Sequence, residues 1–335
     1  MADPKRDPDY LLAAENDKSL NETFYRARPY AYFNQRLESL LLVAGKSEEL
    51  AELLAEGVTV GKLTAGGVPV RTDLPEQERA EVREDRERFV IAEAEVLLHH
   101  AAETLLRLYL AHEDLPPSPW LALAGERHVA AFKAKVAELG EELGDEQRQG
   151  KLAAVFFGSV DRTDLQPTPD EETWNVGLRN VATWLAWYAA HFLDAGVYNA
   201  AKHGLAVQAG ESAFQFGDDD LISRSGPSLA YIEMREDARK RRRWRQTTQW
   251  LDLDRWLAYI FMACRLMKGL MNVGRARYTG AGLTHLDALG IPAFEQTVAG
   301  GIQFDKLSMD LLYYAEPALR ETEDDEPADG PKDEG

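Results

Sequence analysis

The chain has 335 residues, and its 38 lysine and arginine residues are outnumbered by 57 aspartate and glutamate residues, for a formal net charge of −19. Hydrophobic residues make up 45% and charged residues 28% of the sequence, a balance that excludes an intrinsically disordered chain and allows a sizeable core. The acidity excludes a protein that coats a nucleic acid over its whole surface, because counterion release needs clustered lysine and arginine. A local basic site is still compatible with this charge.

The first 72 residues are expected to form an N-terminal helical segment. Ser19 and Glu22 have the spacing of a helix-capping box. Further along, the pattern predicts an amphipathic helix over about 30–43, a short helix that begins at Ser47, and a loop or hairpin over 58–71.

Residues 73–318 are expected to form a helical bundle. Asp73 caps its first helix, 76–112, which is charged all round up to residue 88 and should project into solvent there. The second half of this helix is apolar over most of its circumference and should be central. The other main helices are predicted over 119–143, 170–203 and 252–275, with a shorter one over 145–157.

The predicted helix 170–203 is rich in aromatic residues and contains a possible kink at Gly196. Its helically spaced aromatic residues are expected in the core: Trp184, Trp187, Tyr188 and Phe192. After this helix the apolar period changes from 3.6 to 2, which predicts three antiparallel strands within about 204–251. Residues 280–315 are expected to form short helices and loops. The predicted fold class is therefore mainly α, a helical bundle with a small inserted antiparallel β-sheet.

The C-terminal end concentrates the acidity. Residues 321–335 carry eight acidic side chains against Lys332, a charge of −7, and no large apolar residue. Such a segment cannot bury enough surface to offset the entropy lost on folding, so we predict a disordered acidic tail over 319–335.

The sequence favours a cytoplasmic protein without membrane contact. The first ten residues lack the apolar region of a secretory signal, and the apolar stretch 256–267 is too short to span a bilayer. Cys264 is the only cysteine, so no internal disulfide can form, and its apolar helical surroundings predict an inert buried thiol.

One slanting row of polar residues crosses the apolar half of the first long helix. Glu95, His99, Glu103 and Arg107 follow one another at steps of four. They could form a solvent-facing row of charge pairs, or a polar pocket inside the bundle whose members need partners. With His100 they resemble a di-iron set, but the Glu-x-x-His spacing is absent, so we expect no metal site and no cofactor.

A second candidate site lies at the end of the aromatic helix. Asn199 and His203 are one turn apart, and Gly204 follows. A histidine at a helix C-terminus meets the negative end of the helix dipole, which raises its pKa toward neutrality and suits acid–base chemistry. The alternative is that His203 only caps the helix by hydrogen bonding to its last carbonyl groups.

The segment Tyr198-Asn199-Ala200-Ala201-Lys202-His203-Gly204, which follows a long central helix, resembles the HEPN superfamily. That resemblance implies a helical bundle, often dimeric, and in many members a metal-independent ribonuclease of a toxin–antitoxin or phage-defence system. Asn199 would occupy the polar position of the motif and His203 its histidine. Tyr198 stands where the family has the arginine that would stabilise the phosphorane. A second partial match at Arg179-Asn180 has Trp184 in place of the histidine.

The dense basic run of this acidic chain is Arg239-Lys240-Arg241-Arg242-Arg243-Trp244-Arg245. Trp244 could stack on a base while Arg241 and Arg243 meet phosphates. The alternative is a solvated hairpin whose charges prevent aggregation of the sheet edge.

Together these features favour an RNA-associated, HEPN-like protein of a bacterial defence or stress system. If the chain cleaves RNA, His203 would be the general acid–base, Asn199 would orient it, and Arg107 or an arginine of the basic run would replace the missing electrophile. The residues expected to bind substrate are Tyr198, Lys202, Glu103, His99, His100, Arg241, Arg243 and Trp244. The expected partners are RNA, a cognate protein and a second copy of the chain. Two alternatives stay open: a non-catalytic protein-interaction module, and a small-ligand binder that uses the polar row from Glu95 to Arg107.

Overall fold

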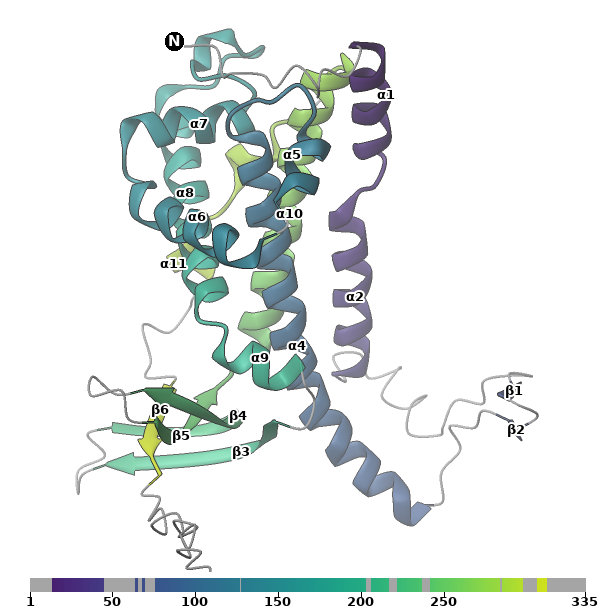
Figure 1. Cartoon of the computed structure of the whole chain (residues 1–335), viewed down its shortest axis with the longest axis vertical. Helices are drawn as coiled ribbons and strands as arrows, with labels where there is room; N and C mark the ends of the chain where they lie inside the picture. The colour runs from purple at the N-terminus through teal and green to yellow at the C-terminus, as the bar shows by residue number, and fades with distance from the viewer. Residues whose placement is uncertain are drawn as a thin grey trace, which may run out of the picture.

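Two long helices, α4 (Glu76–His112) and α10 (Leu253–Thr279), run side by side through the centre of the molecule (Figure 1). The computed structural model describes residues 14–44, 64–65, 68–69, 76–126, 128–202, 206–216, 222–236, 242–283, 285–297 and 306–311. The predicted mainly-α fold with a small antiparallel sheet is confirmed. The predicted helix at Ser47, the cap at Asp73 and the acidic tail lie outside the described residues.

The remaining helices surround this central pair. They are α1 (Ala14–Phe24), α2 (Pro29–Val43), α5 (Pro119–Gly125), α6 (Val129–Glu142), α7 (Glu146–Phe156), α8 (Glu171–Leu193), α9 (Gly196–Lys202) and α11 (Phe294–Thr297), with short 3₁₀ turns at Arg162–Asp164 and Asp287–Gly290. α1 and α2 pack along α10, and α6 and α8 cover the other side of α4. None of the described helices is both long and apolar enough to cross a membrane.

The core forms where the apolar half of α4 meets α10 and α8. The side chains of Leu98, Leu105 and Tyr109 on α4 are fully buried, as are Ile260 and Met267 on α10. The predicted aromatic core residues of α8 are confirmed as buried or partly buried, and so is the Cys264 thiol. The first turns of α4, charged on all sides, extend past the other helices (Figure 1). The bundle therefore owes its stability to a continuous apolar interface rather than to surface charge pairs.

Local signals set the ends of α10. The Asp252 carboxylate accepts a hydrogen bond from the Arg255 backbone N–H at 3.1 Å, which satisfies one of the free donors of the first turn. At the other end Gly280 adopts the left-handed conformation, with φ 71°, that ends many helices.

Two predicted helices are divided in the structure. The predicted helix 119–143 is wrong as a single element, because α5 ends at Gly125 and α6 begins at Val129. The predicted helix 170–203 is α8 and α9, separated at Asp194, so the kink near Gly196 is confirmed. A Cβ on Gly196 would lie 2.6 Å from the Tyr231 hydroxyl, so the break allows the sheet to approach the bundle closely.

The start of α1 also differs from the prediction. The helix begins at Ala14 and runs through Ser19, whose carbonyl accepts a hydrogen bond from the Thr23 hydroxyl at 2.9 Å. The capping-box spacing of Ser19 and Glu22 therefore does not mark a helix start. The helix predicted over about 30–43 is confirmed as α2, and the two-residue strands β1 (Thr64–Ala65) and β2 (Val68–Pro69) confirm a hairpin in that region.

The sheet has four antiparallel strands in the order β3-β4-β5-β6: β3 (Val207–Phe216), β4 (Ile222–Glu236), β5 (Arg242–Trp250) and β6 (Lys306–Asp310). The prediction of only short helices and loops over 280–315 is wrong, because β6 joins the sheet from that region. The alternation of apolar and polar residues in β6 covers only five residues, too few to predict a strand from the sequence. β6 pairs with an edge of the sheet that forms only when the preceding strands fold.

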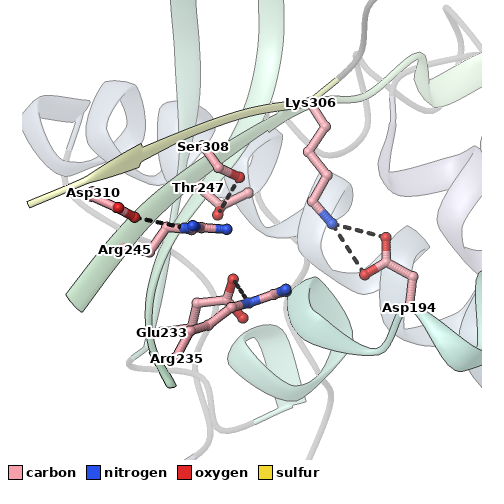
Figure 2. A network of polar contacts seen from close by, with 8 residues as sticks. All are labelled: Asp194, Glu233, Arg235, Arg245, Thr247, Lys306, Ser308 and Asp310. Carbon is pink, nitrogen blue, oxygen red and sulfur yellow. Dashed lines mark hydrogen bonds and ion pairs between the residues drawn. The ribbon is translucent and has the colours of Figure 1, made fainter. Parts of the chain in front are cut away.

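The two faces of the sheet differ in exposure. On β4, Leu229 and Tyr231 face the bundle and are 0% and 3% exposed, whereas Ile232 and Met234 point away and are 55% and 48% exposed. Lys306 donates hydrogen bonds to Asp194 at the end of α8, which ties β6 to the bundle (Figure 2). The sheet is thus attached by one face only.

The close packing of α1 on α10 gives a test of this fold. A Cβ on Gly274 would lie 2.6 Å from the Tyr25 hydroxyl, which donates to His112 Nε2 while His112 Nδ1 donates to the Leu108 carbonyl. Gly274→Ala should therefore lower the free energy of unfolding by about 1–3 kcal/mol, despite the better helix propensity of alanine.

The matched control is Gly150→Ala in α7, where the added methyl group meets nothing within 4 Å. This change should raise the free energy of unfolding by about 0.5–1 kcal/mol. Urea denaturation measures both. An equal gain in stability for both variants would contradict the close approach of Tyr25 to α10.

Candidate functional site

A buried polar cluster lies where α4, α8, α9 and α10 meet. Glu95 on α4 is 1% exposed, and its Oε2 accepts a hydrogen bond of 2.6 Å from Trp256 Nε1 on α10. Its other oxygen lies 3.7 Å from His191 Nε2 on α8. A carboxylate this deep needs such partners, because burial without them costs several kcal/mol. The interpretation of the polar row as a pocket inside the bundle therefore holds for its first two members, Glu95 and His99.

His99 and Tyr198 form the centre of the cluster. The Tyr198 ring stacks on the His99 imidazole with centroids 3.7 Å apart and planes 6° from parallel. The Tyr198 hydroxyl shares a hydrogen bond of 2.8 Å with His100 Nε2, so two successive histidines of α4 hold one tyrosine of α9. Tyr198 is consequently a packing residue at 7% exposure.

Both histidines are held in the neutral form. Burial, and to a lesser extent the nearby His191, lower the pKa of His99 to about 3. Burial also lowers the pKa of His100; Glu103 opposes this effect, and Lys202 and Arg36 add to it. In a neutral imidazole one ring nitrogen donates a hydrogen bond and the other accepts one, so His100 can bond to the Tyr198 hydroxyl in either role.

The other half of the polar row points elsewhere. Arg107 Nε donates to Glu103 Oε1 at 2.8 Å, and Arg107 Nη1 donates to the Glu126 carbonyl at 3.1 Å. The guanidinium also lies 3.9 Å from the centre of the Phe132 ring. These contacts hold Arg107 against α6 and the segment before it, so the predicted row is divided between a buried half and a half-exposed ion pair.

The motif residues of α9 face different environments. Asn199 and Lys202 are exposed, and the Lys202 ammonium lies 5.6 Å from the centre of the Tyr198 ring. His203 and Arg241 lie outside the described residues. The structure therefore brings His99, His100 and Tyr198 together and places Lys202 beside them.

Two members of the cluster were not predicted from the sequence. His191 stacks on Trp187 with centroids 5.1 Å apart, and Trp256 bonds to Glu95 across the bundle. The sequence could have indicated His191, because it is the single histidine among the helically spaced aromatic residues of α8. No local pattern marks Trp256, because its partner lies 161 residues away in the sequence.

Comparison with protein-family models, curated proteins and solved structures finds no match to this chain. Any functional assignment therefore depends on the residues of the chain itself. In the part of the chain that the structure describes, no group of three or more histidine, cysteine, aspartate or glutamate residues is arranged to hold a metal ion.

The basic strand lies apart from the buried cluster, at the outer end of the sheet. Arg245 Nε lies 2.9 Å from Asp310 Oδ1 on β6 (Figure 2). Arg243 Nη1 lies 3.6 Å from the other oxygen of Asp310. Arg242 Nε lies 3.8 Å from Glu236 Oε1 on the neighbouring strand β4. Trp244 pairs in register with Met234, is 42% exposed, and points to the opposite face from Arg243 and Arg245. Here arginine side chains and an exposed aromatic ring share one strand.

A groove of about 890 Å³ runs between α2, α4, α9 and β3. It is mainly apolar, and its lining includes Arg36, Arg88, Phe89, Val96, Ala201 and Val207. None of the four residues from Glu95 to Arg107 in the polar row belongs to this lining. The groove and the predicted ligand site at the polar row are therefore different places.

Because His99 is buried and neutral, we expect the free energy of unfolding to depend on pH. The unfolded chain takes up the proton near pH 6.5 and the folded chain only near pH 3, so acid favours the unfolded state between these values. His99 should therefore remove about 2 kcal/mol from the free energy of unfolding as the pH falls from 7 to 4.5. His99→Phe, which keeps a ring against Tyr198, should make the pH dependence shallower by that amount.

Urea denaturation at the two pH values measures this difference, and His128→Phe on the exposed surface before α6 serves as the control. An identical acid loss in His99→Phe and in the unchanged protein would show that His99 does not resist protonation in the folded state.

Proposed function

We propose that this chain is an RNA-associated, HEPN-like protein that binds single-stranded RNA on strand β5 and has lost the cleavage chemistry of its motif. The observation that carries the proposal is the exposed Trp244 on a strand that also bears Arg242, Arg243 and Arg245. The resemblance of the motif extends the proposal to a bacterial defence or stress system.

The chemistry of this strand suits a single-stranded nucleic acid. An exposed tryptophan offers a flat surface on which a base can stack, a contact worth about 1–3 kcal/mol. Cross-strand neighbours Ile232 and Met234 extend that surface, and Arg242 lies on the same face at its edge. Arginine binds phosphate through paired N–H groups. Arg243 and Arg245 both lie close to the carboxylate of Asp310, and their side chains stay 46% and 35% exposed, so phosphates can reach them.

The surroundings of Tyr198 support binding without cleavage. A phosphorane carries extra negative charge, and a catalyst needs a positive group beside it. Tyr198 carries no charge and is held between His99 and His100. Arg107, the candidate substitute, is already bound by Glu103 and lies against Phe132. Tyr198 thus supplies packing where the superfamily supplies charge.

Fluorescence anisotropy with a labelled 20-nucleotide single-stranded RNA tests the binding. Trp244→Ala should weaken the affinity about 5- to 100-fold, the loss of one stacked base. Trp120→Ala is the matched control, because this tryptophan of α5 is 38% exposed and lies away from the sheet. Arg243→Glu should also weaken binding, and all affinities should fall as salt rises from 50 to 200 mM. Equal affinities for the Trp244 and Trp120 variants would refute the site on β5.

A cleavage assay separates the binding protein from a nuclease. We expect neither the unchanged protein nor His203→Ala to cut RNA in the presence of a metal chelator. Metal-independent cleavage that disappears in His203→Ala while the fold survives would overturn the non-catalytic form of the proposal.

One observation favours a second candidate, a protein-interaction module. The outward face of the sheet exposes a group of large apolar side chains besides Trp244: Ile232, Met234, Met309 and Leu311. Exposed apolar groups that adjoin one another commonly mark a protein-binding surface. The partner would be a cognate protein or a second copy of the chain. Analytical ultracentrifugation distinguishes the two candidates. Self-association through this apolar face should weaken in Met309→Lys and persist at high salt. RNA binding, by contrast, should be lost at high salt.

A further inference from the structure

We propose that the acidic segment 321–334 of this same chain binds the arginine cluster at the outer end of β5, defined here as Arg242, Arg243 and Arg245, and competes there with RNA. The competition rests on the proposed RNA-binding function. The contact between the segment and the cluster rests on the charges, register and chain path described below.

The cluster is a positive site on a negative protein. The side chains of Arg242, Arg243 and Arg245 are 72%, 46% and 35% exposed. Carboxylates near them include Glu236, Asp310, which lies close to two of the arginines, and Glu233, which lies opposite Arg245 on β4. Exposed ion pairs of this kind are weak and exchange readily for other anions. A further carboxylate from a nearby segment can therefore exchange with the carboxylates that these exposed guanidinium groups already contact.

The chain leaves the sheet beside this cluster. β6 is antiparallel to β5, with Asp310 opposite Arg245, and the backbone N–H of Leu311 donates to the Trp244 carbonyl at 2.9 Å. β6 therefore runs toward the Arg242 end of β5, and Leu311 lies beside Trp244. Asp310, the last residue of β6, already makes the contact with Arg243 and Arg245 that we assign to the acidic residues further along the chain.

The acidic segment is close enough to reach the cluster. Nine residues separate Leu311 from Glu321. A linker of that length spans up to about 30 Å, whereas the three residue steps from Arg245 to Arg242 cover about 10 Å of strand. A short linker also holds its two ends at a millimolar effective concentration, so individually weak charge pairs suffice.

The charges of the two parts are complementary. Residues 321–334 carry eight acidic side chains and one lysine. They have no large apolar side chain, so charge rather than packing must provide any attachment. RNA phosphates would meet the same guanidinium groups, and an acidic segment on them would lower the apparent affinity for RNA. Binding would then favour long or concentrated RNA that can displace the segment.

A charge-matched pair of variants of the full chain tests this inference. The first removes three negative charges from the segment, with Asp324→Asn, Asp325→Asn and Glu326→Gln. The control removes three from exposed positions on α6 and α7, with Glu138→Gln, Glu141→Gln and Glu146→Gln, so that both variants have the same net charge. Any difference between them then comes from the position of the charges.

The first readout needs no RNA. Trypsin cleaves after the basic residues of 239–245, and mass spectrometry of the intact chain follows the rate of that cleavage. We expect cleavage at least threefold faster in the segment variant than in the control at 50 mM salt, and equal rates at 500 mM salt, where screening removes the attraction. Equal rates at 50 mM salt would overturn the contact.

The second readout is the affinity for the labelled 20-nucleotide RNA. The segment variant should bind about three- to tenfold more tightly than the control at 50 mM salt. If the segment variant is cleaved faster but neither variant binds RNA, the contact stands and the proposed RNA function fails. If RNA binds to both variants with the same affinity, the competition is refuted.

Discussion

Burial of the apolar faces of α4 and α10 against each other holds this molecule together, and one hydrogen bond crosses that interface at depth. Glu95 on α4 accepts a hydrogen bond from Trp256 on α10, and both side chains are buried. Loss of either partner would leave a buried polar group without a bond, so this pair specifies how the two helices align. α1 and α2 pack on the outer side of α10, and α8 packs on α4, so their positions follow from that alignment.

The segment that resembles the HEPN motif has a structural role in this chain. Tyr198 connects α9 to α4 by stacking on His99 and bonding to His100. The sheet packs against the short helix α9, because Gly196 lets the hydroxyl of Tyr231 come close to the backbone of this helix. Tyr198 therefore helps to join the bundle to the sheet. An arginine in its place would put a charge between the imidazole rings of His99 and His100.

The outer end of the sheet has the opposite character. It is attached to the bundle through one face and through the pair of Lys306 and Asp194, while its other face carries exposed apolar side chains and its arginine cluster is at least one-third exposed. A rigid core and an exposed, charged sheet divide the chain into a part that gives stability and a part that can meet a partner. The proposed contact gives the acidic C-terminal segment a local role at Arg242 and Arg243, in addition to its general effect on solubility.

Local periodicity in the sequence determined the fold class, the central position of the 89–110 helix, the aromatic core of α8 and three of the four strands, because each depends on neighbours within one element. The break between α5 and α6, the strand β6 and the partners of Glu95 depended on tertiary structure. β6 exists only because β5 offers it an unpaired edge, and Trp256 meets Glu95 only because two helices far apart in sequence lie side by side. The polar row shows the same limit, since its spacing placed Glu95 and Arg107 on one helix face. Only packing decided that Glu95 is buried against α10 while Arg107 lies half-exposed on Phe132, because burial depends on what covers a helix and not on the helix alone.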